Sequence, residues 1–398
     1  DRPVALRRVD GHALWANTRA MELAGVTRDT PEPAGGRILR DDAGEPTGVF
    51  VDNAMGLIES TIAGPSAEVI ERRILAAAQV AVAAGLTGVH EMGIGDQTIE
   101  VYRALEARGA LPLRVYAFLQ GDPVVAASLD QRAPPETEAS ASELFTLRAM
   151  KLYADGALGS RGAAMLSPYS DAPGETGNWV HTPEELNAAI EAAVAHGWQL
   201  GVHAIGDAGN RAVLDAYQTA LAPRSGQDLR LRIEHVQVLA PEDLPRLAAL
   251  GVIASMQPTH ATSDMPWAEA RVGGERIAGA YAWRSILASG ARLAAGSDFP
   301  VEEVSPMLGL HAAVTRQDAG GEPPGGWHPG QRLTLEEAIA GFTTGAAYAS
   351  FTETERGMVR RGYLADLTVW DRPLAPDTLL ATRAALTIVG GRVVFERR

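Results

Sequence analysis

From about residue 66 to residue 345, short apolar runs rich in β-branched residues alternate with longer stretches whose apolar positions recur at helical spacing. This alternation is typical of a parallel sheet covered by helices, because each strand–helix–strand unit returns the chain to the same edge of the sheet. A closed (β/α)8 barrel has one strand more than the pattern provides. Seven runs are expected to be strands: Leu86–His90, Leu113–Leu119, Leu147–Tyr153, Gln199–Ala204, Leu229–Val236, Val252–Met256 and Leu293–Gly296.

Two of the helical stretches carry clear end signals. Ser66 is expected to cap a helix that stops at Gly85. Thr182 is expected to open a capping box with Glu185 in "TPEELNAAIEAAVAHG". Such signals predict helix boundaries and say nothing about function.

The regions on either side of the alternation have a different pattern. Residues 1–65 predict a strand, a short helix in "NTRAMELAG" and a hairpin whose turn is Asp42-Ala43-Gly44. Beyond about residue 350, two β segments with a Gly-Gly turn are too few strands for an independent module.

Composition narrows the function classes. The chain has 398 residues, is 46% hydrophobic and carries a net charge of −14, which argues against a general grip on nucleic acid or an anionic membrane. The absence of cysteine excludes disulfides, thiolate zinc sites and a cysteine nucleophile. No apolar run reaches the length of a membrane-spanning helix. We therefore expect a cytoplasmic protein with a small-molecule substrate.

One lysine, Lys151, stands among 35 basic residues, so the other 34 are arginine. Arginine serves wherever this chain needs a plain positive charge. Lysine differs because its primary amine forms a carbamate or a Schiff base once burial lowers its pKa. The alternative is that Lys151 is an ordinary cation, which the use of arginine at every other basic position disfavours.

Catalytic groups of a parallel barrel lie at the carboxyl ends of its strands. Four polar residues occupy such positions: Lys151, His203, His235 and Asp298. Taken singly, each has a structural reading, such as a helix cap for Asp298. Together they form a metal-binding set if the amine is carboxylated, since imidazoles and carboxylates are ordinary ligands of Zn²⁺. We favour a metal-bridging carbamate over a Schiff base.

Longer sequence motifs also indicate a metal-binding enzyme. The chain resembles the amidohydrolase superfamily, and in particular its YtcJ-like branch (amidohydrolase family 3), in "DGHALWANTRAMELAG", "GGRILRDDAGEPTGV", "MKLYADGALGSR", "HAIGDAGNRAVLDAY", "RIEHVQ", "AGSDFP" and "GMVRRGYLADLTVWD". The resemblance covers nearly the whole chain. It implies a distorted (β/α)8 barrel with a small β-sandwich, and metal-dependent hydrolysis, commonly of C–N bonds.

The resemblance also implies an organisation. Residues 1–65 fall in an insertion between strands 1 and 2, residues 66–349 form the catalytic barrel from strand 2 to strand 8, and residues 350–398 form the C-terminal part of the sandwich. The resemblance implies one or two divalent ions, with Zn²⁺ expected, whose ligands are Lys151, His203, His235 and Asp298. Asp298 would also act as the general base and then as the general acid.

One family feature is missing. Strand 1 of the family ends in a His-x-His pair of metal ligands, and no His-x-His occurs in this sequence. We expect that pair in a segment that precedes Asp1 or belongs to a separate chain. The competing hypothesis is a natural truncation with a broken barrel.

Further residues are expected to face the substrate. His90 and Glu91 close the first expected strand, and Tyr153 and Arg161 follow the lysine. Structural hydrogen bonds, and a surface ion pair for Arg161, are the alternatives. The remaining candidates come from the insertion and from the loop after the Val252–Met256 run: Asp10, His12, Trp15, His260 and Trp267.

We therefore expect a metal-dependent amidohydrolase that cleaves an amide or formamide-like bond. Two alternatives stay open: a barrel enzyme that uses Lys151 as a Schiff base, and a noncatalytic barrel kept for binding. A homodimer is expected. The sequence does not distinguish an N-substituted formamide from a cyclic amide, an N-acyl amino acid or an ester as substrate.

Overall fold

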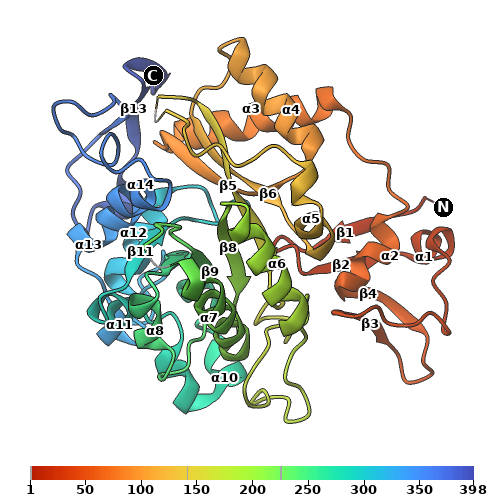
Figure 1. Ribbon diagram of the computed structural model, residues 1–398. Coiled ribbons are helices and arrows are strands. Elements are labelled where there is room, and N and C mark those ends of the chain that lie inside the picture. The colour runs from red at the N-terminus through yellow and green to blue at the C-terminus, as the bar shows by residue number, and fades with distance from the viewer. Residues whose placement is uncertain (1, 141, 225) are drawn as a thin grey trace.

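Seven parallel strands form one curled sheet at the centre of the molecule (Figure 1). The structure is a computed structural model that describes residues 2–398 apart from 141 and 225. Every neighbouring pair in this sheet is parallel, so the expected α/β class with a distorted barrel is confirmed. The sheet runs in the order β11-β10-β9-β8-β7-β6-β5, with β5 Gly88–Ile94, β6 Arg114–Gln120, β7 Phe145–Tyr153, β8 Gln199–Ala204, β9 Arg232–His235, β10 Ile253–Met256 and β11 Arg292–Ala295.

Helices precede the first strand of this sheet, lie between its strands along the chain and follow its last strand, and they pack against its outside (Figure 1). They are α3 Ala67–Ala83, α4 Asp96–Ala107, α5 Pro123–Ala127, α6 Pro183–Ala195, α7 Asp207–Leu221, α8 Leu244–Ala249, α9 Pro258–Asp264, α10 Ala268–Arg276, α11 Trp283–Ala288, α12 Pro306–Thr315, α13 Leu335–Ala340 and α14 Ala346–Ala349. Short 3-10 or π turns occur at 53–55, 129–131, 222–224, 277–279, 329–331, 341–345 and 379–381.

Helix α6 illustrates how sequence determines this packing. Its buried residues Leu186, Ile190, Ala193 and Val194 recur at helical spacing and join the main core. The expected capping box is confirmed at its start: Thr182 accepts from the amide of residue 185, and that residue's carboxylate accepts from the amide of Thr182.

Helix α3 begins at its expected cap. Ser66 does occupy the N-cap position, with extended backbone, but its side chain bonds no amide of the helix. The expected cap is therefore confirmed in its position, without a side-chain hydrogen bond to the helix. At the other end, Gly85 has a φ of +92°, a left-handed conformation that suits glycine and stops the helix.

The N-terminal segment folds into a separate four-stranded antiparallel sheet beside the barrel (Figure 1). Its order is β1-β2-β4-β3, and one face packs on helices α1 and α2 through the buried side chains of Leu14, Ile38 and Phe50. The expected turn is present, since the Asp41 carboxylate accepts from the amides of Ala43 and Glu45 at 2.9 Å each. The bounds are β1 Ala5–Arg7, β2 Ala13–Ala16, α1 Thr18–Ala24, β3 Gly36–Arg40, β4 Pro46–Asp52 and α2 Gly56–Glu59.

The C-terminal segment forms a three-stranded antiparallel sheet, β12 Leu367–Trp370, β13 Ala384–Val389 and β14 Arg392–Glu396. Figure 1 shows it beside α3, on the far side of the molecule from the N-terminal sheet. The hydroxyl of Thr387 donates to the carbonyl of Val82 at 2.7 Å, and a buried ion pair joins Arg114 to Asp366 at 2.7 Å. The division into insertion, barrel and sandwich module stays a prediction.

Candidate metal centre

Parallel pairing brings the strand-end residues to one edge of the sheet. Lys151 pairs in register with Gly201, and Tyr153 pairs with His203 on the next strand. His235 ends β9 opposite Ala204. Asp298 follows β11 by three residues. The four expected ligands therefore lie at or near the carboxyl ends of β7, β8, β9 and β11, as the strand-end pattern predicts.

The imidazoles form a contiguous cluster with the carboxylate of Asp298. The rings of His203 and His235 meet edge to face with centroids 4.6 Å apart, and His260 stacks on His235 at 5.7 Å. Nε2 of His260 lies 3.8 Å from Oδ2 of Asp298. One ligand atom from each of His235, His260 and Asp298 falls within 4.8 Å of the others, a spacing that can hold a metal ion.

Each central histidine is anchored through one ring nitrogen. Nδ1 of His235 donates to Oε1 of Gln257 at 2.8 Å, which leaves Nε2 free. Nε2 of His203 lies 3.5 Å from the carbonyl oxygen of Gly156 and 3.6 Å from Oδ1 of Asp155, which leaves Nδ1 free. Such outer partners fix the tautomer and orientation of a metal-binding histidine.

Burial keeps these imidazoles neutral. It lowers the pKa of His203 and His235 well below the usual value, and nearby positive groups lower it further. Burial also lowers the pKa of His260 to about 4, and its Nε2 is buried without a hydrogen-bond partner among the described residues. A neutral imidazole has a lone pair to offer a cation, so this donor set fits a divalent metal.

Lys151 is 3% exposed and lies among groups of both signs. Burial lowers the pKa of its amine to about 8, although the negative charges of Glu234 and Asp298 oppose the shift. Nζ donates to the carbonyl of Leu152 at 3.3 Å and lies 4.0 Å from the ring centroid of Tyr153. A buried amine with this pKa is neutral often enough to react.

Two carboxylates of the site have raised pKa values. Burial raises the pKa of Asp298 to about 6, against the positive charge of Lys151. Burial raises the pKa of Asp155 to about 7, although its carboxylate accepts from the amides of Ile205, Gly206 and Ala164. Asp155 is fully buried next to His203, so it can orient that ring but does not contact a ligand.

The backbone is strained where the site is built. His235, Val236 and Asp298 have φ values of +78°, +43° and +59°, in the left-handed region that non-glycine residues avoid. Asp52 and Arg161 share this feature, with φ values of +49° and +55°. Such conformations persist only where the surroundings impose them, and they concentrate at functional sites.

The N-terminal sheet supplies one side chain to the cluster. The ring of His12 lies 5.0 Å from that of His203, centroid to centroid, and its Nδ1 lies 2.7 Å from Oδ1 of Asp52. Asp10 accepts from the backbone amide of His12 and pairs with Arg8. The tyrosine ring of Tyr153 also reaches the cluster, 5.6 Å from that of His203.

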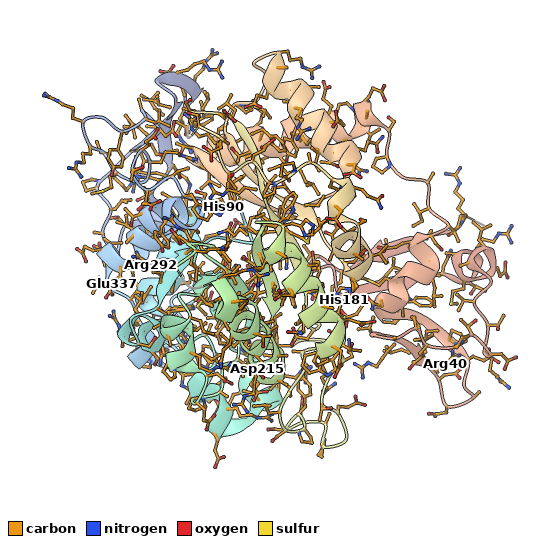
Figure 2. The ribbon with its side chains drawn as sticks, viewed as in Figure 1. Arg40, His90, His181, Asp215, Arg292 and Glu337 are labelled. Atoms are coloured by element: carbon orange, nitrogen blue, oxygen red, sulfur yellow. The ribbon has the colours of Figure 1, made fainter. Side chains whose placement is uncertain are left out.

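Other expected substrate-facing residues have structural partners instead. Figure 2 shows His90 near the middle of the view, and its Nδ1 accepts from Arg232 inside the curled sheet at 2.9 Å. Glu91 accepts from the hydroxyl of Tyr102 at 3.3 Å and so faces outward. Trp15 is 60% exposed, on the sheet face opposite its core.

Arg161 lies in the loop after β7, and the indole of Trp267 lies close to the same loop. Arg161 forms a two-point ion pair with Asp171 at 3.1 and 3.0 Å, which matches the surface ion-pair alternative. A side chain at Gly159 would lie 3.5 Å from the indole of Trp267. A cavity of about 360 Å³ lies between the N-terminal sheet and the loop after β7, lined in part by Arg37, Val51 and Arg161.

Sequence reasoning missed three polar residues of the site. Gln257 comes directly after β10 and Asp155 two residues after β7, so the strand-end pattern contains both. Asp52 ends a strand of the N-terminal sheet, to which that barrel pattern does not apply. Among the described residues, no helix combines the length and apolar character needed to cross a bilayer.

Comparisons place the chain among known proteins. Its sequence matches the amidohydrolase family over residues 1–395. It is 35% identical to the putative amidohydrolase YtcJ of Bacillus subtilis (strain 168) over 406 residues, covering 100% of this chain and 75% of that protein. It is 29% identical to the N-substituted formamide deformylase of Arthrobacter pascens over 399 residues, covering 97% of this chain and 72% of that enzyme.

A solved structure agrees. An uncharacterized metal-dependent hydrolase from Pyrococcus horikoshii OT3 superposes with a TM-score of 0.74 at 27% identity, over 91% of this chain and 70% of that one. On the family match and the sequence identity, this chain belongs to the amidohydrolase family.

Proposed function

We propose that this protein is a metal-dependent hydrolase that cleaves a C–N bond of an amide or formamide. The observation that carries the proposal is the strand-end cluster, in which neutral imidazoles, a carboxylate and a buried amine converge. Membership of the amidohydrolase family supports hydrolysis by such a cluster.

The donor set suits Zn²⁺, which prefers imidazole and carboxylate ligands. We assign His203, His235, Asp298 and carboxylated Lys151 to one or two ions. The buried Nε2 of His260, close to Asp298, admits His260 as a further ligand. Metal analysis of His260→Gln decides this point: an unchanged metal content assigns His260 to the substrate.

Carboxylation turns Lys151 from a cation into a ligand. The neutral amine attacks carbon dioxide, the new N–C bond forms as a C=O π bond opens to a carboxylate oxygen, and one proton leaves the nitrogen for solvent. A pKa of about 8 keeps a useful fraction of the amine neutral near pH 7 to 8. Bicarbonate, which supplies carbon dioxide, is expected to promote metal loading.

Asp298 is assigned the proton transfers. A bound divalent ion supplies Lewis acidity, lowering the pKa of water and polarising a carbonyl oxygen. The Asp298 carboxylate accepts a proton from the attacking water and donates it to the leaving nitrogen. Its half-buried position and raised pKa, about 6, suit a group that must hold and release that proton.

The substrate class rests on chemistry and on similarity. The N-substituted formamide deformylase of Arthrobacter pascens is 29% identical, which favours formamides among the expected amides. His12 and Tyr153 are assigned to face the substrate, as is His260 if it is not a metal ligand. A cavity of about 360 Å³ beside the N-terminal sheet, lined in part by Arg37 and Arg161, offers room for a small organic group.

A hydrolysis panel tests the proposal. The purified protein, loaded with Zn²⁺ and bicarbonate, is offered N-butylformamide, a cyclic amide, an N-acetyl amino acid and an ester. We expect release of amine and acid from a C–N substrate, loss of turnover with a chelator and recovery with Zn²⁺. Turnover of the ester alone, or turnover that persists in chelator, contradicts the proposal.

The buried amine of Lys151 also keeps the Schiff-base hypothesis testable, because a pKa of about 8 suits an imine-forming lysine. Borohydride reduction in the presence of carbonyl substrates would attach a fragment to Lys151, detected by mass spectrometry. We expect no attachment, since the neighbouring imidazoles favour a metal-bound carbamate.

A further inference from the structure

His12 reaches the metal-binding cluster from outside the barrel. It lies in the loop between β1 and β2, yet its ring is 5.0 Å from that of His203. An element of a different sheet therefore delivers an imidazole to the strand ends.

Asp52 fixes the orientation of that imidazole. Its side chain is 1% exposed, and Oδ1 lies 2.7 Å from Nδ1 of His12. Oδ2 accepts from Nδ2 of Asn178 at 2.9 Å, and Gly156 and Gly162 leave room for it that any Cβ atom would fill. A carboxylate held this firmly, at a residue with left-handed backbone, restricts how the ring can turn.

The hydrogen bond also sets the tautomer. A carboxylate only accepts, so Nδ1 of His12 carries the proton, and in the neutral ring the lone pair lies at Nε2. Among the described residues Nε2 has no hydrogen-bond partner, and the side chain is 15% exposed. The free acceptor is thus open at the mouth of the site, beside His203.

We propose that Nε2 of His12, oriented by Asp52, accepts a hydrogen bond from the N–H group of the substrate amide. This inference rests on the proposed function and narrows its substrate class to amides that bear an N–H. N,N-disubstituted amides leave the acceptor unpaired in a desolvated site and are disfavoured. His12 is then a substrate-binding residue and Asp52 its positioning residue.

The competing interpretation is that the pair only docks the N-terminal sheet on the barrel. Other contacts already serve that purpose, such as the hydrogen bond from Nδ2 of Asn53 to the carbonyl of Val180 at 3.0 Å. The two interpretations differ in what they predict for substrate selectivity, since docking alone has no preference for an amide N–H.

The test compares N-butylformamide with N-butyl-N-methylformamide on the Zn²⁺-loaded protein. One hydrogen bond corresponds to a preference of about tenfold in kcat/KM. We expect His12→Phe, which removes the acceptor, to abolish this preference, and His12→Gln, which keeps one, to retain part of it. Unchanged selectivity in His12→Phe overturns the inference, as does loss of metal from that variant, which would make His12 a ligand.

Binding provides a readout separate from turnover. In Asp298→Asn, which removes the proposed base, titration calorimetry measures the affinity of each formamide with and without His12→Phe. Preference for N-butylformamide that depends on His12 supports the inference even if the intact protein fails to hydrolyse either compound, in which case the proposed function alone fails. If neither formamide binds, the inference is overturned.

Asp52→Asn tests the positioning role. The side-chain amide of the asparagine can donate to Nδ1 of His12, which moves the imidazole proton to Nε2. The acceptor at Nε2 is then lost, while the side chain at position 52 keeps its size. We expect histidine ¹⁵N NMR to report this tautomer change for His12, together with loss of selectivity and an unchanged melting temperature. A retained tautomer with retained selectivity contradicts the assignment of Asp52.

Discussion

At the scale of single residues, both the composition of the chain and the geometry of the site single out Lys151. The sequence offers one lysine among arginines, and the structure buries its amine beside Asp298 and the imidazoles. We expect Lys151→Arg to lower turnover by at least about a hundredfold, because a guanidinium keeps the charge but forms no carbamate. Turnover and bound metal are measured together.

Arg148→Lys is the matched control for that change. Arg148 lies on the same strand, with its guanidinium 3.5 Å from the ring centroid of Phe351, away from the cluster. Exchanging the two cation types there is expected to leave metal content and turnover close to those of the unaltered protein. Equal losses in both variants would trace the effect to the strand rather than to the amine of Lys151.

The pH profile depends on Asp298. A general base works only when deprotonated, and burial raises the pKa of this carboxyl to about 6. We therefore expect kcat/KM to be level above pH 6 and to fall about tenfold per unit below it. A profile that stays flat down to pH 4.5 at constant metal occupancy would remove Asp298 from the base role.

The residues that sequence reasoning found and those it missed differ in one respect. Lys151, His203 and His235 follow the strand-end pattern, which depends only on local order along the chain. Asp52 is recognised as a site residue only from the structure, where the N-terminal sheet lies against the barrel. Its hydrogen-bond partner Asn178 is 126 positions away in the sequence. Local patterns do not encode such long-range placement.

At the scale of elements, the alternation of apolar runs predicted each strand of the seven-stranded sheet, but it predicted the ends of the strands less accurately. The run at Leu229–Val236 was expected to be one strand, but β9 covers only Arg232–His235. The backbone turns left-handed at Arg230 and again at His235 and Val236, which ends pairing at both sides. Hydrophobicity continues through these turns, so it does not mark them.

The capping box of α6 gives an element-scale prediction. Thr182→Ala removes the side chain that accepts from the amide of Glu185, at a cost of about 1 kcal/mol in the free energy of unfolding. Chemical denaturation measures this loss, and turnover at low temperature is expected to be unchanged. Thr182→Ser, which keeps the hydroxyl, should recover most of the stability; no recovery would contradict the capping account.

At the scale of the whole molecule, ligands from separate strands converge on one proposed ion, so metal should stabilise the fold as well as support catalysis. An ion at about a thousand times its Kd adds about 4 kcal/mol to the free energy of unfolding. We expect removal of the metal by a chelator to lower the melting temperature by several degrees and readdition to restore it. Calorimetric scans that superpose with and without metal would contradict this coupling.

The most direct test of the central claim is the metal content of the purified protein, measured by inductively coupled plasma mass spectrometry. We predict one to two equivalents of a divalent ion, with Zn²⁺ expected, and a large loss in His203→Ala and in Lys151→Arg when both variants remain folded. A folded protein that binds no divalent ion even after incubation with Zn²⁺ and bicarbonate would contradict the account.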